Sequence, residues 1–152
     1  MTWKPHVTVA AVIEQGGCFL CVEETIAGKR RLNQPAGHLE PGESLTDAVI
    51  REVHEETTRA FTPETLVGVY LWRAGPQRPT FVRVTFTGHV GEADPMLQTD
   101  AEIDANVWLG ADAIRARRHE WRSPLVMECI DDYLAGQRYP LSLLRSLVDQ
   151  TP

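Results

Sequence analysis

Three glutamates near the middle of the chain are the residues best placed to do chemistry. Glu52, Glu55 and Glu56 fall within one turn of a helix that the sequence predicts over residues 45–57. Carboxylates this close repel one another, and partial burial adds a desolvation penalty for each unpaired charge. A bound cation would offset both effects. Because oxygen ligands favour hard divalent ions, the sequence predicts a site for Mg²⁺, with Mn²⁺ as the alternative.

The spacing of the predicted helix indicates that these glutamates face inward. Positions 45, 48, 49, 52, 53 and 56 form a single stripe, which is apolar in its first two turns and then carries Glu52 and Glu56. Arg51 can reach Glu55 one turn later, and can reach back toward Glu43, but one guanidinium cannot neutralise three carboxylates. On composition alone, an acidic helix end that simply lies in water remains the alternative.

The sequence around the helix is expected to position it. Pro41-Gly42 forms a turn, Ser44 is a candidate N-cap with Asp47 three residues later, and no glycine or proline follows until Pro63. Ahead of the turn, residues 32–37 are expected to be extended and irregular, because they contain proline and glycine.

The remaining patterns predict a mixture of strands and helices. Apolar and β-branched runs predict strands at residues 6–13, 18–23, 66–72, 80–90 and 107–109, the first two forming a hairpin across residues 14–17. Residues 25–31 are predicted to be a polar turn and residues 91–105 an acidic loop. Helices are predicted at residues 111–116, from Pro124, with Ser123 as its N-cap, until Gly136 stops it, and over residues 141–148. Strands first and helices interspersed later predict an α+β or mixed α/β fold rather than a doubly wound sheet.

Composition limits the possible functions. A chain of 152 residues is of single-domain size, so one domain over residues 1–152 is expected. The net charge of −6 and scattered basic residues disfavour nucleic acid as a partner. No leader and no apolar run of membrane-spanning length is present, so a cytoplasmic protein without membrane contact is expected. Cys18 and Cys21 lie in a strand-like run without a second metal half-site, and with Cys129 they are expected to be reduced thiols.

Residues 37–59, GHLEPGESLTDAVIREVHEETTR, resemble the Nudix box: glycine, five residues, glutamate, seven residues, then Arg-Glu-apolar-any-Glu-Glu. Every position agrees up to the last glutamate. Thr58 stands where the box has glycine and Arg59 where it has an aliphatic residue, and loss of that glycine is expected to weaken the helix cap by about 1 kcal/mol. Segments at residues 6–10, 22–25, 33–40, 122–126 and 136–141 further resemble the NudJ-type Nudix phosphatases.

This resemblance implies both a fold and an activity. The fold is an α/β/α sandwich around a mixed sheet, with the box as loop, helix and loop. The activity is Mg²⁺-dependent hydrolysis of nucleoside di- and triphosphates and of thiamine-related pyrophosphates, with release of inorganic phosphate. The implied metal ligands are Glu52, Glu55, Glu56, the carbonyl of Ala36 or Gly37, and Glu102. Glu43 and Arg51 are implied to orient the helix, and the general base is either Glu52 or Glu102.

Four further residues are candidates for substrate contact. Arg83 would clamp a phosphate or be an exposed strand charge, and Trp72 would stack on a pyrimidine-like ring or pack at the core or rim. Arg122 would serve the substrate or the start of the following helix. His38 lies in the metal-side loop and is expected to touch phosphate, whereas the other histidines are expected to be structural.

Two other function classes compete with a phosphate-releasing enzyme. One is a pyrophosphohydrolase that yields a monophosphate and pyrophosphate, and the other is a Nudix-fold module that binds a nucleotide without turnover. A plain cation-binding protein is disfavoured, because the glutamates lack the alternating Asp/Asn ligands of a calcium loop. The expected partner is a small-molecule phosphate anhydride, acted on by a monomer or a homodimer.

Overall fold

The computed structural model describes residues 1–149, so the last three residues of the predicted domain lie outside the described part of the chain. The strands are β1 (His6–Val12), β2 (Glu14–Gln15), β3 (Cys18–Ile26), β4 (Lys29–Asn33), β5 (Ala36–His38), β6 (Phe61–Arg73), β7 (Thr80–Val90), β8 (Ile103–Gly110) and β9 (Tyr139–Pro140). The helices are α1 (Leu45–Thr57), α2 (Ala111–Ala116) and α3 (Leu125–Leu134), with 3-10 turns at Arg118–Glu120 and Leu141–Leu143. None of the helices described is long and apolar enough to span a membrane.

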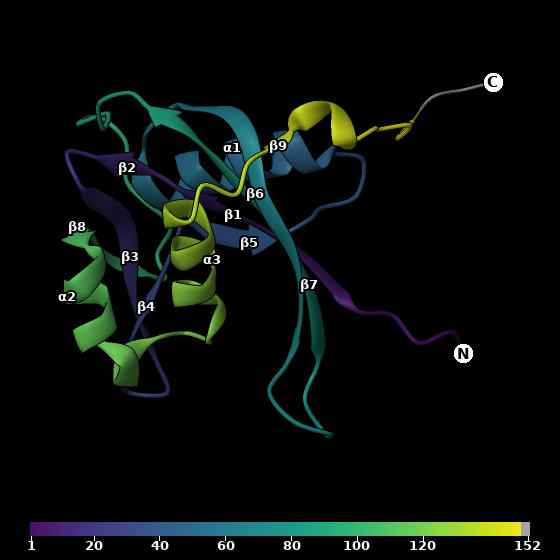
Figure 1. Ribbon diagram of the computed structural model, residues 1–152, viewed down its shortest axis with the longest axis horizontal. Helices are drawn as coiled ribbons and strands as arrows, with labels where there is room; N and C mark the ends of the chain where they lie inside the picture. The colour runs from purple at the N-terminus through teal and green to yellow at the C-terminus, as the bar shows by residue number, and fades with distance from the viewer. Residues whose placement is uncertain (150–152) are drawn as a thin grey trace.

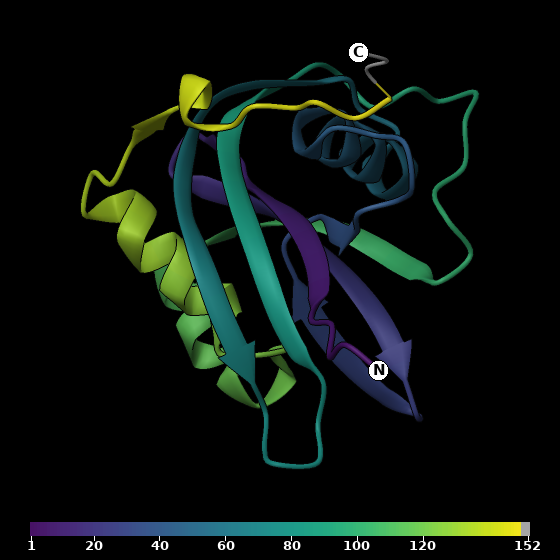
Figure 2. The ribbon, with the colours of Figure 1, turned by 90° about the vertical axis from the view of Figure 1, so that its right-hand side faces the viewer.

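The strands form two sheets between helices (Figure 1). The larger sheet has the order β5-β1-β7-β6-β9 and is mixed, because β1 pairs with β7 in parallel while the other neighbours are antiparallel. In the smaller sheet β3 is central and pairs with β2, β4 and β8. Figure 2 shows α1 on one side of the larger sheet and α2 with α3 on the other. The predicted α+β sandwich is confirmed.

Strand β1 shows why both faces of the larger sheet need a helix. Successive side chains of a strand point to opposite faces. Val9 and Ala11 pack into the core cluster that contains the apolar side chains of α1, whereas Val12 packs into the cluster that contains those of α3. All three are buried, so the C-terminal half of the strand, residues 9–12, is apolar on both faces rather than alternating.

The predicted hairpin between residues 6–13 and 18–23 is wrong in its pairing. The turn at Gly16-Gly17 exists and both glycines have positive φ, but the strand that pairs back onto β3 is the two-residue β2. Strand β1 instead lies in the other sheet, between β5 and β7. The chain passes from one sheet to the other at Ile13, whose carbonyl accepts a hydrogen bond from the N–H of Leu20 at 2.9 Å.

Other boundaries differ from the predictions for local reasons. Residues 25–31 form a tight hairpin, β3 to β4, instead of a longer polar turn, because Ala27 and Gly28 both adopt positive φ. Strand β6 begins at Phe61, and β8 begins at Ile103, inside the predicted acidic loop. Pro124 has helical dihedrals and α3 begins at Leu125, one residue later than predicted.

The predicted helix over residues 141–148 is wrong. Only a 3-10 turn at Leu141–Leu143 forms, and Leu144 already has an extended backbone. Leu141 and Leu144 nevertheless pack against the core cluster on the α1 side. A 3-10 turn brings residues i and i+3 to the same side, so it satisfies this pair without a longer helix, and Val148 is left exposed.

Candidate active site

Helix α1 has the predicted bounds and the predicted cap. The hydroxyl of Ser44 accepts a hydrogen bond from the N–H of Asp47 at 3.0 Å. Along the inward stripe, Ala48, Val49 and Val53 are fully buried. The stripe continues into Glu52, which is 9% exposed, and Glu56, which is 6% exposed. The helix therefore carries two carboxylates into the interior, and the alternative of an acidic helix end in water is excluded for this pair.

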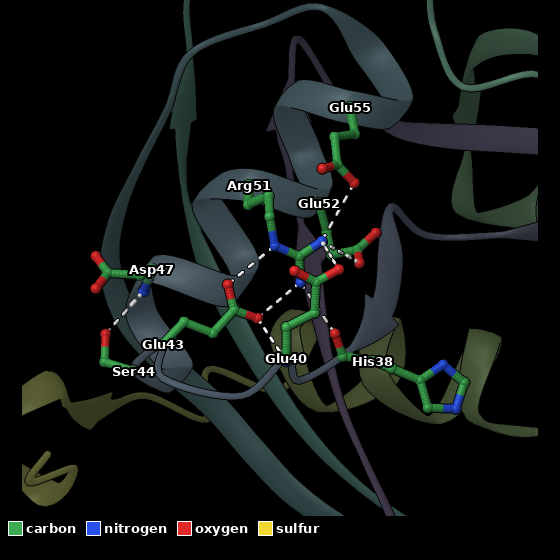
Figure 3. Close-up of polar contacts among 8 residues, drawn as sticks. All are labelled: His38, Glu40, Glu43, Ser44, Asp47, Arg51, Glu52 and Glu55. Carbon is green, nitrogen blue, oxygen red and sulfur yellow. Dashed lines mark hydrogen bonds and ion pairs between the residues drawn. The ribbon is translucent and has the colours of Figure 1, made fainter. Parts of the chain in front are cut away.

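Arg51 is the cation that Glu43, Glu52 and Glu55 share (Figure 3). Its guanidinium donates to both carboxylate oxygens of Glu43, at 2.9 and 2.7 Å, to Glu52 at 2.8 Å and to Glu55 at 3.2 Å. It also donates to the backbone carbonyl of His38 at 3.0 Å. The predicted reach toward Glu43 and Glu55 is confirmed, and the contacts with Glu52 and the His38 carbonyl are additional. Arg51 thus ties the loop after β5 to the helix.

The pKa values around Arg51 follow from these hydrogen bonds. The bonds from Arg51 hold the pKa of Glu43 below its usual value. The pKa of Arg51 is itself raised, mainly by the hydrogen bond to Glu43. Burial raises the pKa of Glu52 even though Arg51 opposes that shift. The single positive charge of Arg51 is therefore shared among several carboxylates. It does not fully offset the effect of burial on Glu52.

Glu56 is the most deeply buried acid of the site. One of its carboxylate oxygens accepts a hydrogen bond from the N–H of Ala36, on β5, at 2.7 Å. Burial raises its pKa to about 9, although the Ala36 bond acts in the opposite direction, and the nearby Glu52 and Glu24 add to the rise. Without a cation, this carboxyl group is protonated at neutral pH. A cation next to it would favour the ionised form.

This shifted pKa predicts a pH dependence of stability for the metal-free protein. Between about pH 5 and pH 9, folded Glu56 holds a proton that the unfolded chain has already released. The free energy of unfolding should therefore fall as pH rises through this window. Urea unfolding in EDTA at several pH values measures the effect. Glu56→Gln is neutral at every pH and can still accept the hydrogen bond from Ala36, so its free energy of unfolding should depend less on pH. Equal pH dependence in the two proteins would contradict the raised pKa of Glu56.

Gly37 provides the surface against which Glu52 lies. A Cβ atom at this position would lie 2.1 Å from the Cδ atom of Glu52 and 2.2 Å from its nearer carboxylate oxygen. Any side chain at residue 37 would therefore displace the carboxylate. The backbone of strand β5 at Gly37 and the Glu52 side chain of helix α1 are therefore in direct contact.

These acids line a cavity of about 670 Å³ together with residues of the acidic loop. Its charged lining consists of Glu24, Glu40, Glu52, Glu55, Glu56, Asp100, Glu102 and Asp104, with Arg51 and Arg122. The predicted ligand Glu102 is therefore on the same cavity as the α1 carboxylates. Glu24, Asp100 and Asp104 were not predicted as site residues. The loop is fixed to α1 by hydrogen bonds from the N–H of Asp100 to the carbonyl of Glu55 and from the side chain of Asn106 to the carbonyl of Glu56, both at 2.9 Å.

The residues present fit a hard divalent cation in charge and ligand type. Eight acids face two arginines across the cavity, and all of the acids offer oxygen. Within residues 1–149, no three Asp, Glu, His or Cys side chains are gathered closely enough to hold an ion as they stand. The reason is visible in the hydrogen bonds: Arg51 draws Glu52 and Glu55 toward itself, while Glu56 is turned to the N–H of Ala36.

A second cavity of about 440 Å³ adjoins the acidic one, and Glu24, Gly37, His38 and Arg122 line both. Its aromatic wall is formed by Trp72 and Phe81, whose rings stack with centroids 5.9 Å apart and planes at 28°. The two cavities therefore differ in chemistry: one is acidic and the other is aromatic with buried polar groups.

All four candidate substrate residues line this second cavity. Arg83 is only 6% exposed, so the alternative of an exposed strand charge is wrong. His38 lies at the junction of the cavities, where its ring contacts that of His6 through a 3.3 Å hydrogen bond, and burial is the main reason that its pKa is lowered. Arg122 shares this junction, and its backbone N–H donates to the carbonyl of Leu32 at 2.9 Å. Sequence reasoning missed Asn33, which also lines the cavity.

Thr58 ends α1 in the left-handed conformation that the missing glycine would adopt, with φ of 59° and ψ of 15°. Its hydroxyl accepts a hydrogen bond from the N–H of Asp94 at 3.1 Å, which helps to hold the acidic loop. Arg59, at the second departure from the pattern, lies over the ring of Trp108 at 5.4 Å from its centroid.

A pair of substitutions isolates the conformational cost at Thr58. Thr58→Gly and Thr58→Ala both remove the hydroxyl, but only glycine is relaxed at this φ. The glycine variant should be more stable than the alanine variant by about 1 kcal/mol, net of the larger entropy of unfolded glycine. Urea unfolding of both proteins measures the difference, and an alanine variant as stable as the glycine variant would rule out strain at this residue.

Comparison with known proteins gives the family. A family model described as NUDIX domain matches residues 4–129. The Escherichia coli K12 protein named Phosphatase NudJ is 44% identical over 142 residues, 93% of this chain and 92% of that protein, and its Shigella boydii counterpart gives the same values. A solved NUDIX hydrolase from Nitrosomonas europaea is 50% identical with a TM-score of 0.93, covering 97% of this chain and 100% of that one. A UDP-X diphosphatase structure, 19% identical with a TM-score of 0.73 over 92% of this chain and 68% of its own, shows only the shared fold. The chain therefore belongs to the Nudix hydrolases, and phosphatases of the NudJ kind are among its relatives.

Proposed function

We propose that this hydrolase uses Mg²⁺ to release inorganic phosphate from nucleoside di- and triphosphates and from thiamine-related pyrophosphates. The observation that carries the proposal is the placement of buried Glu52 and Glu56 on the inward stripe of α1, in a cavity whose acids outnumber its arginines. The similarity to proteins named phosphatase, over 93% of the chain, supports release of phosphate rather than pyrophosphate.

The residues proposed to hold the metal are Glu52, Glu55 and Glu56, with the carbonyl of Ala36 or Gly37 and, from the acidic loop, Glu102. When bound, Mg²⁺ supplies positive charge for the phosphate oxygens and lowers the pKa of a water molecule. For these ligands to converge, Glu52 and Glu55 must turn partly away from Arg51. The Arg51 contacts with Glu43 and the His38 carbonyl keep the guanidinium in place while they do so.

Residues of the protein are then available to accept a proton, contact the phosphates and surround the organic group. Glu52, held against Gly37 and with its pKa raised by burial, is the first candidate to accept the proton of the attacking water, and Glu102 is the second. Arg122 and His38, at the junction of the two cavities, are positioned to contact the phosphates that lead away from the metal side. Trp72 and Phe81 then wall the space that remains for the organic group.

Identification of products tests this proposal. Purified protein with Mg²⁺ is incubated with the common nucleoside di- and triphosphates and with thiamine pyrophosphate, and phosphate and pyrophosphate are measured separately. Phosphate as the first product is expected. Pyrophosphate together with a monophosphate would establish the pyrophosphohydrolase alternative instead, and no turnover of any compound would favour a binding module.

Three further properties belong to the same proposal. We propose that residues 1–152 act as one domain, because one family model spans most of the chain. A cytoplasmic location agrees with three free thiols, two of them buried. A monomer or homodimer acting on a small molecule, without nucleic acid, agrees with the net charge of −6 and with a site formed by two adjoining cavities.

A further inference from the structure

Arg83 is a buried cation that has no acidic partner in the part of the chain that the structure describes. It lies in the middle of β7 and is 6% exposed, yet its hydrogen bonds go to two neutral amide oxygens, those of Gln34 and Asn33, each at 3.2 Å. Within residues 1–149, no carboxylate lies within ion-pair distance of its guanidinium. A buried charge of this kind is costly unless something else supplies electron-rich partners. Arg83 lines the second cavity, so a ligand there can supply them.

The neighbouring amides hold the guanidinium in one orientation. Gln34 is 1% exposed, and its side-chain nitrogen donates to the carbonyl of Val126 at the start of α3. Its oxygen is therefore directed to Arg83, at 3.2 Å. Gln34 does not line the cavity, which makes it a positioning residue: from just after the end of β4, its side chain joins α3 to β7.

The orientation of the Asn33 amide is fixed by the same network. One atom of this amide lies within hydrogen-bond distance of two donors, the N–H of Gln34 at 3.0 Å and Arg83 at 3.2 Å, so that atom must be the oxygen. The other amide atom is then the nitrogen. This NH₂ group makes no hydrogen bond to any residue in the described part of the chain. Asn33 lines the cavity and is half-buried, so this group is available to donate to a ligand.

Sheet register places Arg83 away from the metal side. Residues opposite one another on neighbouring strands share a face, and the row across the sheet is His38 on β5, Thr8 on β1 and Arg83 on β7. Arg83 is therefore two strand spacings, about 10 Å, from the strand that carries Gly37 and contacts α1. The adjacent row on the same face contains Phe81 and Trp72, which form the aromatic wall.

We propose that Arg83 and Asn33 recognise the organic group of the substrate, as a planar heteroaromatic ring whose carbonyl oxygens or ring nitrogens accept hydrogen bonds from their N–H groups. The ring lies against the wall formed by Trp72 and Phe81, and the phosphates extend past Arg122 and His38 to the acidic cavity. This inference rests on the proposed function for the direction of the phosphate chain. It replaces a phosphate clamp at Arg83 with a specificity-determining role.

Separate binding of ring-bearing and ring-free ligands tests the inference. Calorimetry measures the dissociation constants of CTP, thiamine pyrophosphate and inorganic tripolyphosphate, with Ca²⁺ in place of Mg²⁺ because it takes the same oxygen ligands in a looser geometry. Arg83→Met should weaken at least one ring-bearing ligand by about tenfold or more relative to tripolyphosphate. Gln34→Leu should shift the same ratio in the same direction. Arg73→Met, the same substitution at an exposed arginine in the same sheet, should leave the ratio as it is.

Asn33→Asp is a second test variant, chosen because it keeps the hydrogen bonds that hold Gln34 and Arg83 in place. Aspartate keeps the oxygen that accepts from Gln34 and Arg83 but removes the NH₂ donor, and it is expected to lower the ring-to-tripolyphosphate preference by about tenfold. If Arg83→Met weakened both ligand classes equally, Arg83 would bind phosphate. If binding of both classes were unchanged in both variants, neither Arg83 nor Asn33 would contact the ring. Either result overturns the inference. Because the readout is binding, it is independent of the phosphate-release assay that tests the proposed function.

Discussion

Glu56→Gln is expected to remove nearly all Mg²⁺-dependent hydrolysis while the protein remains folded. Glutamine has the shape of glutamate and can still accept the hydrogen bond from Ala36, so the packing beneath α1 is preserved. It cannot supply the negative charge that a divalent ion needs at this buried position. The initial rate of phosphate release should fall by at least about a hundredfold, and Glu55→Gln should have an effect of the same order.

A surface glutamate provides the matched control. Glu64 lies exposed on β6 and, among residues 1–149, pairs only with His89, so Glu64→Gln changes the same functional group away from both cavities. Its rate should equal that of the unmodified protein. Circular dichroism and thermal unfolding establish that all three variants are folded. Near-normal rates for both α1 variants would contradict the assignment of these carboxylates to the metal.

Gly37→Ala is expected to reduce hydrolysis by about a hundredfold with little effect on stability. The added Cβ would lie 2.1 Å from the Cδ atom of Glu52, so the carboxylate must move. It is the end of a flexible side chain next to a cavity, and moving it should change the free energy of unfolding by less than about 1 kcal/mol. A displacement of about 1 Å in a catalytic group is enough for a rate loss of that size.

Gly88→Ala is the opposite case and serves as the control for steric substitution. A Cβ at residue 88 would lie 2.0 Å from the backbone carbonyl oxygen of Thr62, within the β6–β7 pairing, and the backbone cannot move aside cheaply. This variant should lose about 3 kcal/mol of stability. If Gly37→Ala instead lost stability like Gly88→Ala, or kept full activity, the close packing of Glu52 on Gly37 would not be a catalytic requirement.

The parts of the fold that were predicted correctly are those that local sequence determines. Helix α1 carries its own N-cap and its own periodicity, and the structure has it at the predicted residues. Strand β7 and helix α2 were also predicted at their observed bounds. The inward orientation of Glu52 and Glu56 followed from the 3.6-residue period alone, because a helix fixes the relative direction of its side chains.

The parts that were missed depend on contacts between distant residues. The sequence around Ile13 shows a turn and two apolar strands, but nothing in it shows that β1 leaves β3 to pair with β5 and β7. The sequence left Arg83 open between a phosphate clamp and an exposed strand charge, because its partners Asn33 and Gln34 lie about 50 residues away in the chain. Glu24 likewise joins the site only because β3 runs beside the acidic loop.

The most direct test of the account is the metal dependence of phosphate release. Initial rates with a nucleoside triphosphate are measured first in excess EDTA and then with increasing Mg²⁺, for the unmodified protein and for Glu56→Gln. The account predicts no release in EDTA, a saturable rise with Mg²⁺ for the unmodified protein, and almost none for the variant. Release that proceeds equally well in EDTA, or a Mg²⁺ response that Glu56→Gln leaves intact, would contradict it.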